Sequence, residues 1–222
     1  AQRGGWRVAL HTDPDGAAQG SMRFLVEDFI PERIDFTMDF PEGAIARDAV
    51  PPVQIAAKYL YGAPGSNLTI EGELELQSTW SYPGFETFTF GLNDEPNFQS
   101  YEAFVDLPAT DEAGAAELPL YLPAMETTTR PMQMVVRLRM ADGSGRPVER
   151  ELTRVLMPAA PTIGIKPLFD WTLGENENAA FDIATLNPDL TPRTNAPLTW
   201  VMNRVNRRYQ WFSNDGNWRW EP

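Results

Sequence analysis

Residues able to carry out covalent or acid-base chemistry are scarce in this sequence. Its 222 residues include one histidine, His11, and no cysteine. A Ser-His-Asp triad could therefore be built only around His11. Thiol catalysis, disulfides and cysteine-ligated metals are excluded. Because His11 stands in a strand-like segment beside the turn sequence TDPDG, a solvated histidine at a strand edge is the favoured interpretation.

Paired acids are the other candidates for chemistry. Asp94 with Glu95, and Asp111 with Glu112, could in principle act as the acid and base of a glycosidase. Both pairs lie in turn-like segments with no aromatic cleft implied nearby, which favours solvated loop acids. The turns DPDG and NDGN offer oxygen ligands for calcium, but neither continues into a 12-residue loop that ends in Glu. We therefore predict no catalytic, cofactor-binding or metal-binding residue, no cofactor and no enzymatic activity.

The charge balance disfavours nucleic acid as a partner. Asp and Glu number 31 against 18 Lys and Arg, so the net charge is -13, and a phosphate backbone would be repelled. The segment NRVNRRYQW (203–211) could bind single strands, but a strand with arginines outward and aromatics inward has the same pattern. No apolar stretch approaches the roughly 20 residues of a membrane span, and AQRGGWRVAL is no signal peptide. We expect a soluble chain or a piece of a longer one.

The elements that position these residues are strands. In KYLYGAPGSNLTIEGELEL (58–76), Leu68, Ile70, Leu74 and Leu76 alternate with polar residues, which is the period-2 pattern of a half-buried strand. A similar alternation runs through 53–61 before the Gly-Ala-Pro-Gly turn. The pattern predicts a hairpin of two antiparallel strands, with one face in the core. Val135 and Leu138, farther along the chain, are predicted to face the same core.

Strand-like segments recur along the whole chain, separated by turns such as DPDG, ADGSG and NDGN. No helix-period run exceeds about two turns, and strands at this spacing predict antiparallel β-sandwiches. The predicted strands are Trp6–Thr12, Ser21–Phe29, Ile34–Phe40, Val53–Leu60, Leu68–Leu76, Glu86–Phe90, Tyr101–Leu107, Ala116–Tyr121, Met132–Met140, Val148–Met157, Ala180–Leu186, Leu198–Val205, Arg208–Phe212 and Trp218–Trp220.

Two proline-bearing segments look like domain boundaries. EDFIPERI (27–34) contains Pro31, and MPAAPTIGIKPLF (157–169) contains three prolines. Proline stiffens such junctions, and motion between rigid domains is expected at Pro31 and at 158–161. Since a sandwich of this type needs about 100 residues, the pieces before and after these boundaries are too short to be complete. The middle piece alone is long enough.

Four sequence blocks carry a resemblance to a known family. They read GGWRVALHTD…MRFLVEDFIPERI, KYLYGAPGSNLTIEGEL, RPVERELTRVLMPAAPTIGIKPLFD and RRYQWFSNDGNWRWEP. In combination they resemble the bacterial α2-macroglobulins, large proteins that trap proteases. The blocks lie in order and cover most of the chain. The YLYGAP turn, GIKPLFD and YQWF…WRWEP are specific as a set, whereas each alone is weak.

The resemblance implies a string of macroglobulin-like sandwiches similar to fibronectin type III folds. Residues 1–31 would close one domain, 32–159 would form a complete domain, the fifth in the family's order, and 160–222 would open a third. The family's thioester needs a cysteine, so that function must lie outside this chain. The stretches 94–100 and 188–197 are too short for the protease-cleaved bait region. No family site is assigned here.

The resemblance also implies a role for the chain. It would be a non-catalytic scaffold segment of a protease inhibitor that serves bacterial defence, with target proteases and neighbouring macroglobulin-like domains as partners. A periplasmic location follows, with a lipid anchor on the inner membrane for the parent protein.

Aromatic residues near the end of the chain suggest a different class of function. A β-sandwich module could bind carbohydrate or a cell-surface partner through exposed aromatics. The residues concerned are Tyr209, Trp211, Phe212, Trp218 and Trp220. A core-facing hairpin has the same pattern. Because the end pieces have too few strands to close a sandwich, we expect either self-association through 208–220 or disordered end pieces.

Overall fold

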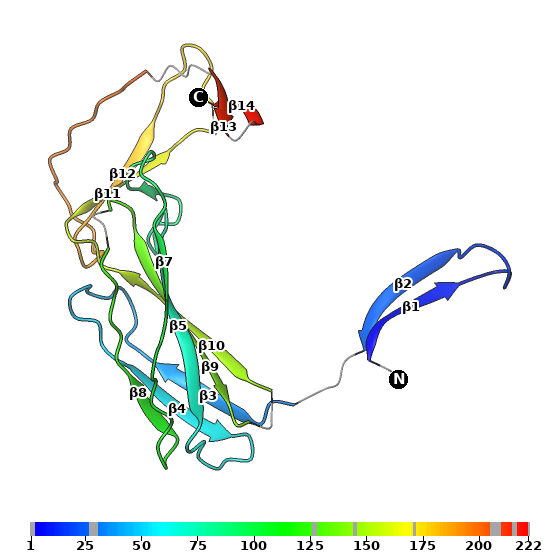
Figure 1. The fold of residues 1–222 in the computed structure, drawn as a ribbon. Helices are drawn as coiled ribbons and strands as arrows, with labels where there is room; N and C mark the ends of the chain where they lie inside the picture. Colours follow the sequence, from blue (N-terminus) through cyan, green and yellow to red (C-terminus); the bar gives the residue numbers. More distant parts are fainter. Residues whose placement is uncertain are drawn as a thin grey trace. The chain divides into compact units, whose positions relative to one another are not determined.

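The computed structural model describes residues 3–26, 31–125, 128–143, 146–170, 172–204, 210–214 and 217–221 (Figure 1), with the backbone alone for the last two ranges. Every strand pair in these ranges is antiparallel, and none of these residues is helical. The prediction of an all-β fold is confirmed. The chain divides into two compact units, 1–192 and 193–222.

The strands follow the predicted order closely. Their bounds are β1 Gly4–Leu10, β2 Gly20–Val26, β3 Ile34–Asp39, β4 Val53–Tyr59, β5 Thr69–Ser78, β6 Thr89–Phe90, β7 Gln99–Ala103, β8 Ala115–Leu118, β9 Met132–Ala141, β10 Val148–Leu156, β11 Thr162–Pro167, β12 Phe181–Leu186, β13 Gln210–Asn214 and β14 Asn217–Glu221.

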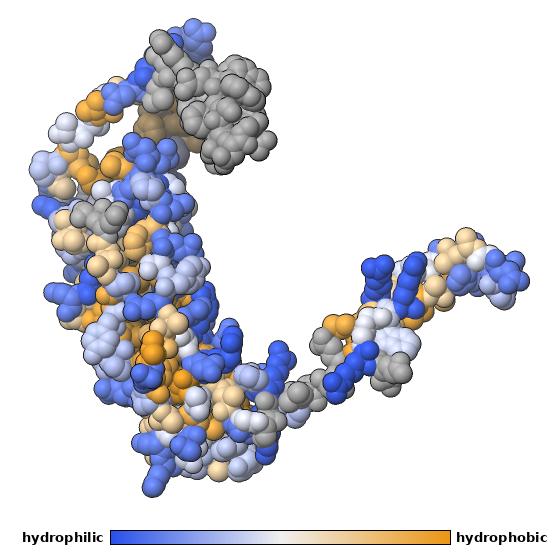
Figure 2. All heavy atoms as spheres, viewed as in Figure 1, coloured by the Kyte–Doolittle hydropathy of each residue, from blue (hydrophilic) through white to orange (hydrophobic). Residues whose placement is uncertain are grey.

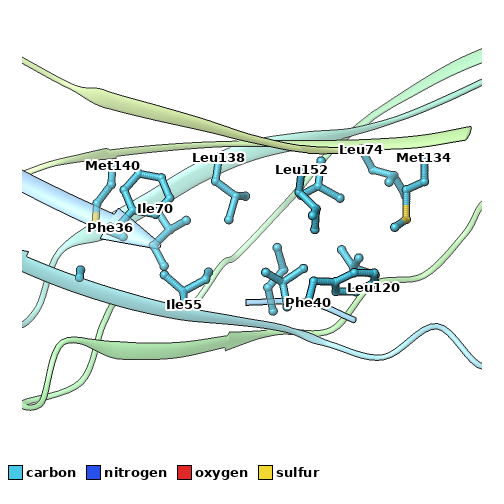
Figure 3. Packing of buried hydrophobic residues seen from close by; sticks show 14 of the residues in the cluster. Phe36, Phe40, Ile55, Ile70, Leu74, Leu120, Met134, Leu138, Met140 and Leu152 are labelled. Carbon is cyan, nitrogen blue, oxygen red and sulfur yellow. The ribbon is translucent and has the colours of Figure 1, made fainter. Parts of the chain in front are cut away.

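A two-layer sandwich occupies the middle of the chain. One sheet has the order β10-β9-β5-β7, and the other has the order β3-β4-β8. Side chains from both sheets meet in one buried cluster, and Figure 3 shows Ile70, Leu138 and Met134 on one side of it and Ile55, Phe40 and Leu120 on the other. The two sheets thus bury their alternating apolar faces against each other.

The turn at 62–65 corrects the predicted hairpin. β4 pairs with β3 and β8, whereas β5 pairs with β9 and β7, so the two strands belong to different sheets. Gly65 lies at the crossing, where an added Cβ would stand 2.8 Å from Leu68 Cδ1. Period-2 alternation identifies the buried face of a strand but not its partner, and both strands have a buried face here.

The predicted core is confirmed except at Val135. Leu68, Ile70, Leu74, Leu76 and Leu138 all belong to the buried cluster between the sheets. Val135 is buried but lies opposite Glu75 in the register, on the face away from that cluster. Residues of one strand at odd and even positions point to opposite faces, so Val135 and Leu138 could not both face inward.

Smaller sheets lie on either side of the sandwich in the sequence. β1 and β2 form a two-stranded hairpin, and its exposed apolar side chains include Trp6, Val8, Met22 and Phe24. Figure 2 shows apolar surface on this hairpin beside strongly polar residues. β13 pairs with β14, with Trp211 opposite Trp220 in the register. The predicted strand at 198–205 is wrong over 198–204, which contain no strand.

A three-stranded sheet has the order β12-β11-β6. Its central strand, β11, was not predicted, because its segment reads as a proline-rich boundary and Pro167 ends it. One face of β11 and β12 is exposed and carries Ile163, Ile165 and Ile183. β6 comes from the sequence range predicted for the middle domain, yet it pairs with β11 in the following range.

Candidate functional site at the junction of β6 and β11

The residues that could have carried catalysis lie in turns and on exposed edges. His11 follows β1, and its Nδ1 is 2.9 Å from the carbonyl oxygen of Gly16, on the surface. Asp111 Oδ1 accepts hydrogen bonds from the backbone N–H groups of Ala113 and Ala115, at 2.9 and 2.8 Å. Both residues hold their own turns together, as short polar side chains commonly do.

Glu95 also makes structural contacts. Its Oε1 accepts a hydrogen bond from the backbone N–H of Thr129 at 3.1 Å, and Oε2 accepts one from the Thr129 hydroxyl. Hydrogen bonds from Thr128 and Thr129 lower the pKa of the Glu95 carboxyl. A general acid needs the opposite shift at neutral pH. Asp94, the neighbour of Glu95 in the sequence, is exposed. The described residues hold no group of three or more acidic, His or Cys side chains placed to bind a metal.

Charged residues on the outer face of the four-stranded sheet pair with one another. Arg137 Nη1 lies 2.7 Å from Glu75 Oε2, and its Nε lies 2.9 Å from Glu151 Oε2. Arg139 Nη2 lies 2.7 Å from Glu149 Oε2. The arginines of β9 thus lie between glutamates of its two neighbours, β5 and β10.

Glu75 is the buried member of this set. Hydrogen bonds from Gln99 and then from Arg137 lower the pKa of its carboxyl, against the opposing effect of burial. A buried carboxylate is tolerated when its oxygens are paired in this way. The oxygens of Glu75 are thus taken up by donors of the chain itself.

A cluster of polar and aromatic contacts outside the sandwich core surrounds the segment 79–98, which we term the β6 arm. Arg130, at the base of the arm, is buried, with only 3% of its surface exposed. Its guanidinium carbon lies 3.8 Å from the centre of the Trp80 ring. It also donates hydrogen bonds to the Leu92 carbonyl and to Asn97 Oδ1. A cation over an aromatic face in a desolvated setting is a strong contact.

Aromatic side chains gather at the tip of the β6 arm. Phe90 is fully buried, and its ring packs edge-to-face against Tyr82 with 4.9 Å between centroids. Leu186 of β12 completes this second buried cluster. Burial raises the pKa of the Tyr82 hydroxyl to about 12. The tip therefore presents a neutral, apolar surface to the β11–β12 sheet.

Gly164 of β11 makes this contact possible. It lies opposite Phe90 in the register, and an added Cβ would stand 2.5 Å from the Phe90 ring. Any larger residue would force the ring and the strand apart. The sequence contained a signal for this site, since one glycine stands among apolar residues in TIGIKP and aromatics cluster at 80–90, but its pairing partner is not visible from the sequence.

The arrangement has no nucleophile paired with a base, and the aromatics pack against the chain itself. These contacts hold parts of the chain together and do not form a binding or catalytic site.

The side chains of the aromatic hairpin at 209–220, considered above as a binding surface, lie outside the described residues. In the described part of the chain, no helix has the length and apolar character needed to cross a bilayer.

Family models match the chain in two consecutive ranges. The model of the bacterial alpha-2-macroglobulin MG5 domain matches residues 32–158. The model of bacterial macroglobulin domain 6 matches residues 164–222.

Curated relatives extend the match over the whole chain. It is 30% identical over 238 residues to an alpha-2-macroglobulin of Xylella fastidiosa strain Temecula1, covering 100% of this chain and 14% of that protein. It is 29% identical over 240 residues to the alpha-2-macroglobulin of Escherichia coli K12, covering 99% of this chain and 14% of that protein. The chain thus spans about one-seventh of the length of these relatives.

Solved structures share the fold. The native conformation of Escherichia coli alpha-2-macroglobulin matches with a TM-score of 0.66 at 24% identity, over 100% of this chain and 15% of that one. Salmonella alpha-2-macroglobulin reacted with methylamine matches with a TM-score of 0.65 at 26% identity, over the same shares. The MG5 match over more than half of the chain, together with these relatives, shows that the chain belongs to the bacterial α2-macroglobulin family, which confirms the resemblance seen in its sequence.

Proposed function

We propose that this chain is a non-catalytic scaffold segment of a bacterial α2-macroglobulin that traps and inhibits proteases. Support comes from relatives described as trypsin-activated and as activated by porcine elastase, which points to proteases as the partners of the whole protein. Within the parent, the segment would hold neighbouring domains in place. Target proteases would contact the parent rather than a site in this segment.

The observation that carries the scaffold role is the joint between β6 and β11. This side-chain cluster joins two parts of the same chain, through the contacts of Arg130 with Trp80 and of Phe90 with Tyr82 and Leu186. A catalytic or ligand-binding module would instead direct such groups into a cleft.

The proposal includes an order of domains. Residues 32–159 would be the complete fifth macroglobulin-like domain, with the end of its predecessor at 1–31 and the start of its successor at 160–222. The parent would act in the periplasm, anchored by lipid to the inner membrane, and would serve bacterial defence.

Protease inhibition by the parent protein tests this function. The full-length protein, incubated with trypsin, is expected to block digestion of a large protein substrate, because the trapped protease is enclosed. The isolated 222-residue chain is expected neither to inhibit trypsin at equimolar concentration nor to hydrolyse substrates. A full-length protein that leaves trypsin fully active on large substrates would refute the trapping role, and stoichiometric inhibition by the isolated chain would refute the scaffold role.

Self-association of the isolated chain is a further expectation. The exposed apolar residues of β1–β2 and of β11–β12 offer apolar area to a second copy, and the aromatic residues in the sequence 208–220 are a further candidate for the contact. Sedimentation velocity at several concentrations should show a concentration-dependent shift toward dimers. The same measurement after removal of 193–222, which keeps the contact of β6 with β11, should show a reduced shift, and an unchanged shift would exclude the aromatic segment 208–220 as the contact.

A further inference from the structure

The position of the β6 arm bears on how the sandwich and the β11–β12 sheet can move. We propose that the arm, residues 79–98, locks the sandwich and the β11–β12 sheet into one rigid body, so that the proline-rich segment 158–161 between them is not a hinge. This replaces the expectation from the sequence that motion occurs at these prolines.

The base of the arm is fixed to the sandwich. Arg130 lies two residues before Met132, the first residue of β9. Its guanidinium contacts the Trp80 ring and donates hydrogen bonds to the Leu92 carbonyl and to Asn97. Gly91 has a φ of +80°, and an added Cβ would stand 2.6 Å from Arg130 Cγ. The backbone of the arm therefore lies directly against the arginine, and the two cannot slide past each other without a clash.

The tip of the arm is fixed to the following sheet. Phe90 and Thr89 pair with Gly164 and Ile165 as the edge strand of that sheet. The Phe90 ring fills the space above Gly164. Separation of the two parts would break this pairing and expose Phe90, Tyr82 and Leu186, which are all fully buried.

A second attachment holds the chain just before the prolines. Ile45 and β10 exchange backbone hydrogen bonds: Ile45 N–H donates to the Val155 carbonyl at 2.9 Å, and Met157 N–H donates to the Ile45 carbonyl at 2.8 Å. Arg47 Nε also donates to the Met157 carbonyl at 3.0 Å. The prolines at 158 and 161 thus connect Met157, which is held by the sandwich, to Thr162, the first residue of β11. Rotation about 158–161 would therefore also have to break the pairing of β6 with β11 and the buried contacts around Phe90.

Distances between spin labels can test this rigidity. Because the chain has no cysteine, the double variant Thr37→Cys, Ile183→Cys carries labels only at these two exposed positions, one on β3 and one on β12. Pulsed electron resonance on the 222-residue chain is expected to give one narrow distance distribution. A broad distribution in this otherwise unchanged chain would overturn the proposal.

Two further variants separate the arm from the prolines. Insertion of Gly-Ser-Gly after Ala159 is expected to leave the width unchanged, because the arm still holds both parts. Gly164→Val is expected to broaden the distribution at least twofold, because its side chain displaces the Phe90 ring. Ile163→Ala is the matched control on the exposed face of the same strand, and its width should not change.

Suppose that the Gly-Ser-Gly insertion broadens the distance distribution and Gly164→Val does not. The proline segment, not the arm, would then fix the position of the β11–β12 sheet against the sandwich, which would overturn the proposal. A narrow distribution in both Gly164→Val and Phe90→Ala would show that the tip contact is dispensable. If Gly164→Val unfolds the sheet, Phe90→Ala with amide exchange of β11 provides the same test: its protection should fall at least tenfold while that of β5 stays unchanged.

Discussion

Ile70→Asp is expected to abolish cooperative unfolding of the sandwich. Ile70 is buried in β5, opposite Met140 and between the two sheets. An unpaired carboxylate there costs on the order of 5 kcal/mol or more, comparable with the whole stability of about 5–15 kcal/mol of a typical domain. Thermal unfolding followed by far-UV circular dichroism should lose its sigmoidal transition.

Thr69→Asp is the matched control for this prediction. Thr69 precedes Ile70 in β5 and is exposed on the outer face of the sheet. The same carboxylate placed there remains hydrated, so the free energy of unfolding should change by about 0.5 kcal/mol or less. A spectrum and melting curve of Ile70→Asp equal to those of the unsubstituted chain would contradict the core assignment.

Arg130→Ala is expected to lower the free energy of unfolding by about 3 kcal/mol. The substitution removes the contact with Trp80 and leaves the Leu92 carbonyl and Asn97 Oδ1 without their donor. The cation–π contact of this buried guanidinium contributes up to about 2 kcal/mol, and hydrogen bonds from a charged donor contribute about 1.5–3 kcal/mol. Urea unfolding monitored by tryptophan fluorescence measures the change.

Arg150→Ala provides the comparison for an exposed arginine. Arg150 Nη2 lies 2.6 Å from Asp35 Oδ1, and the two side chains are 44% and 35% exposed. Ion pairs of this kind contribute less than about 1 kcal/mol. Equal losses in the two variants would mean that the buried position of Arg130 has no special energetic role.

The sequence predicted which residues of the sandwich are buried, because a half-buried strand records its environment at every second position. This held for Ile70, Leu74 and Leu138, which all lie in the core. The pattern did not predict which strands pair. β4 and β5 flank a short turn and both have a buried face, and that description fits a hairpin as well as a crossing between sheets.

The junction could not be predicted for a related reason. Phe90 reads as an apolar residue of a short strand, and Gly164 reads as a flexible residue near prolines. Their importance arises from their contact with each other, which a single sequence does not encode locally. Arg130 gave even less signal, since nothing in its neighbourhood distinguishes a buried arginine from a surface one.

The pairing of β6 with β11 has a consequence for the order of events when the chain is made. Phe90 and Gly164 are separated along the chain by β7, β8, β9 and β10, and contacts between such distant residues form slowly because a long loop must first close. During synthesis the sandwich strands through β10 leave the ribosome before β11, and domains fold as units in that direction. We therefore expect the arm to be in place when Gly164 emerges, so that the folded sandwich serves as the template to which β11 is added.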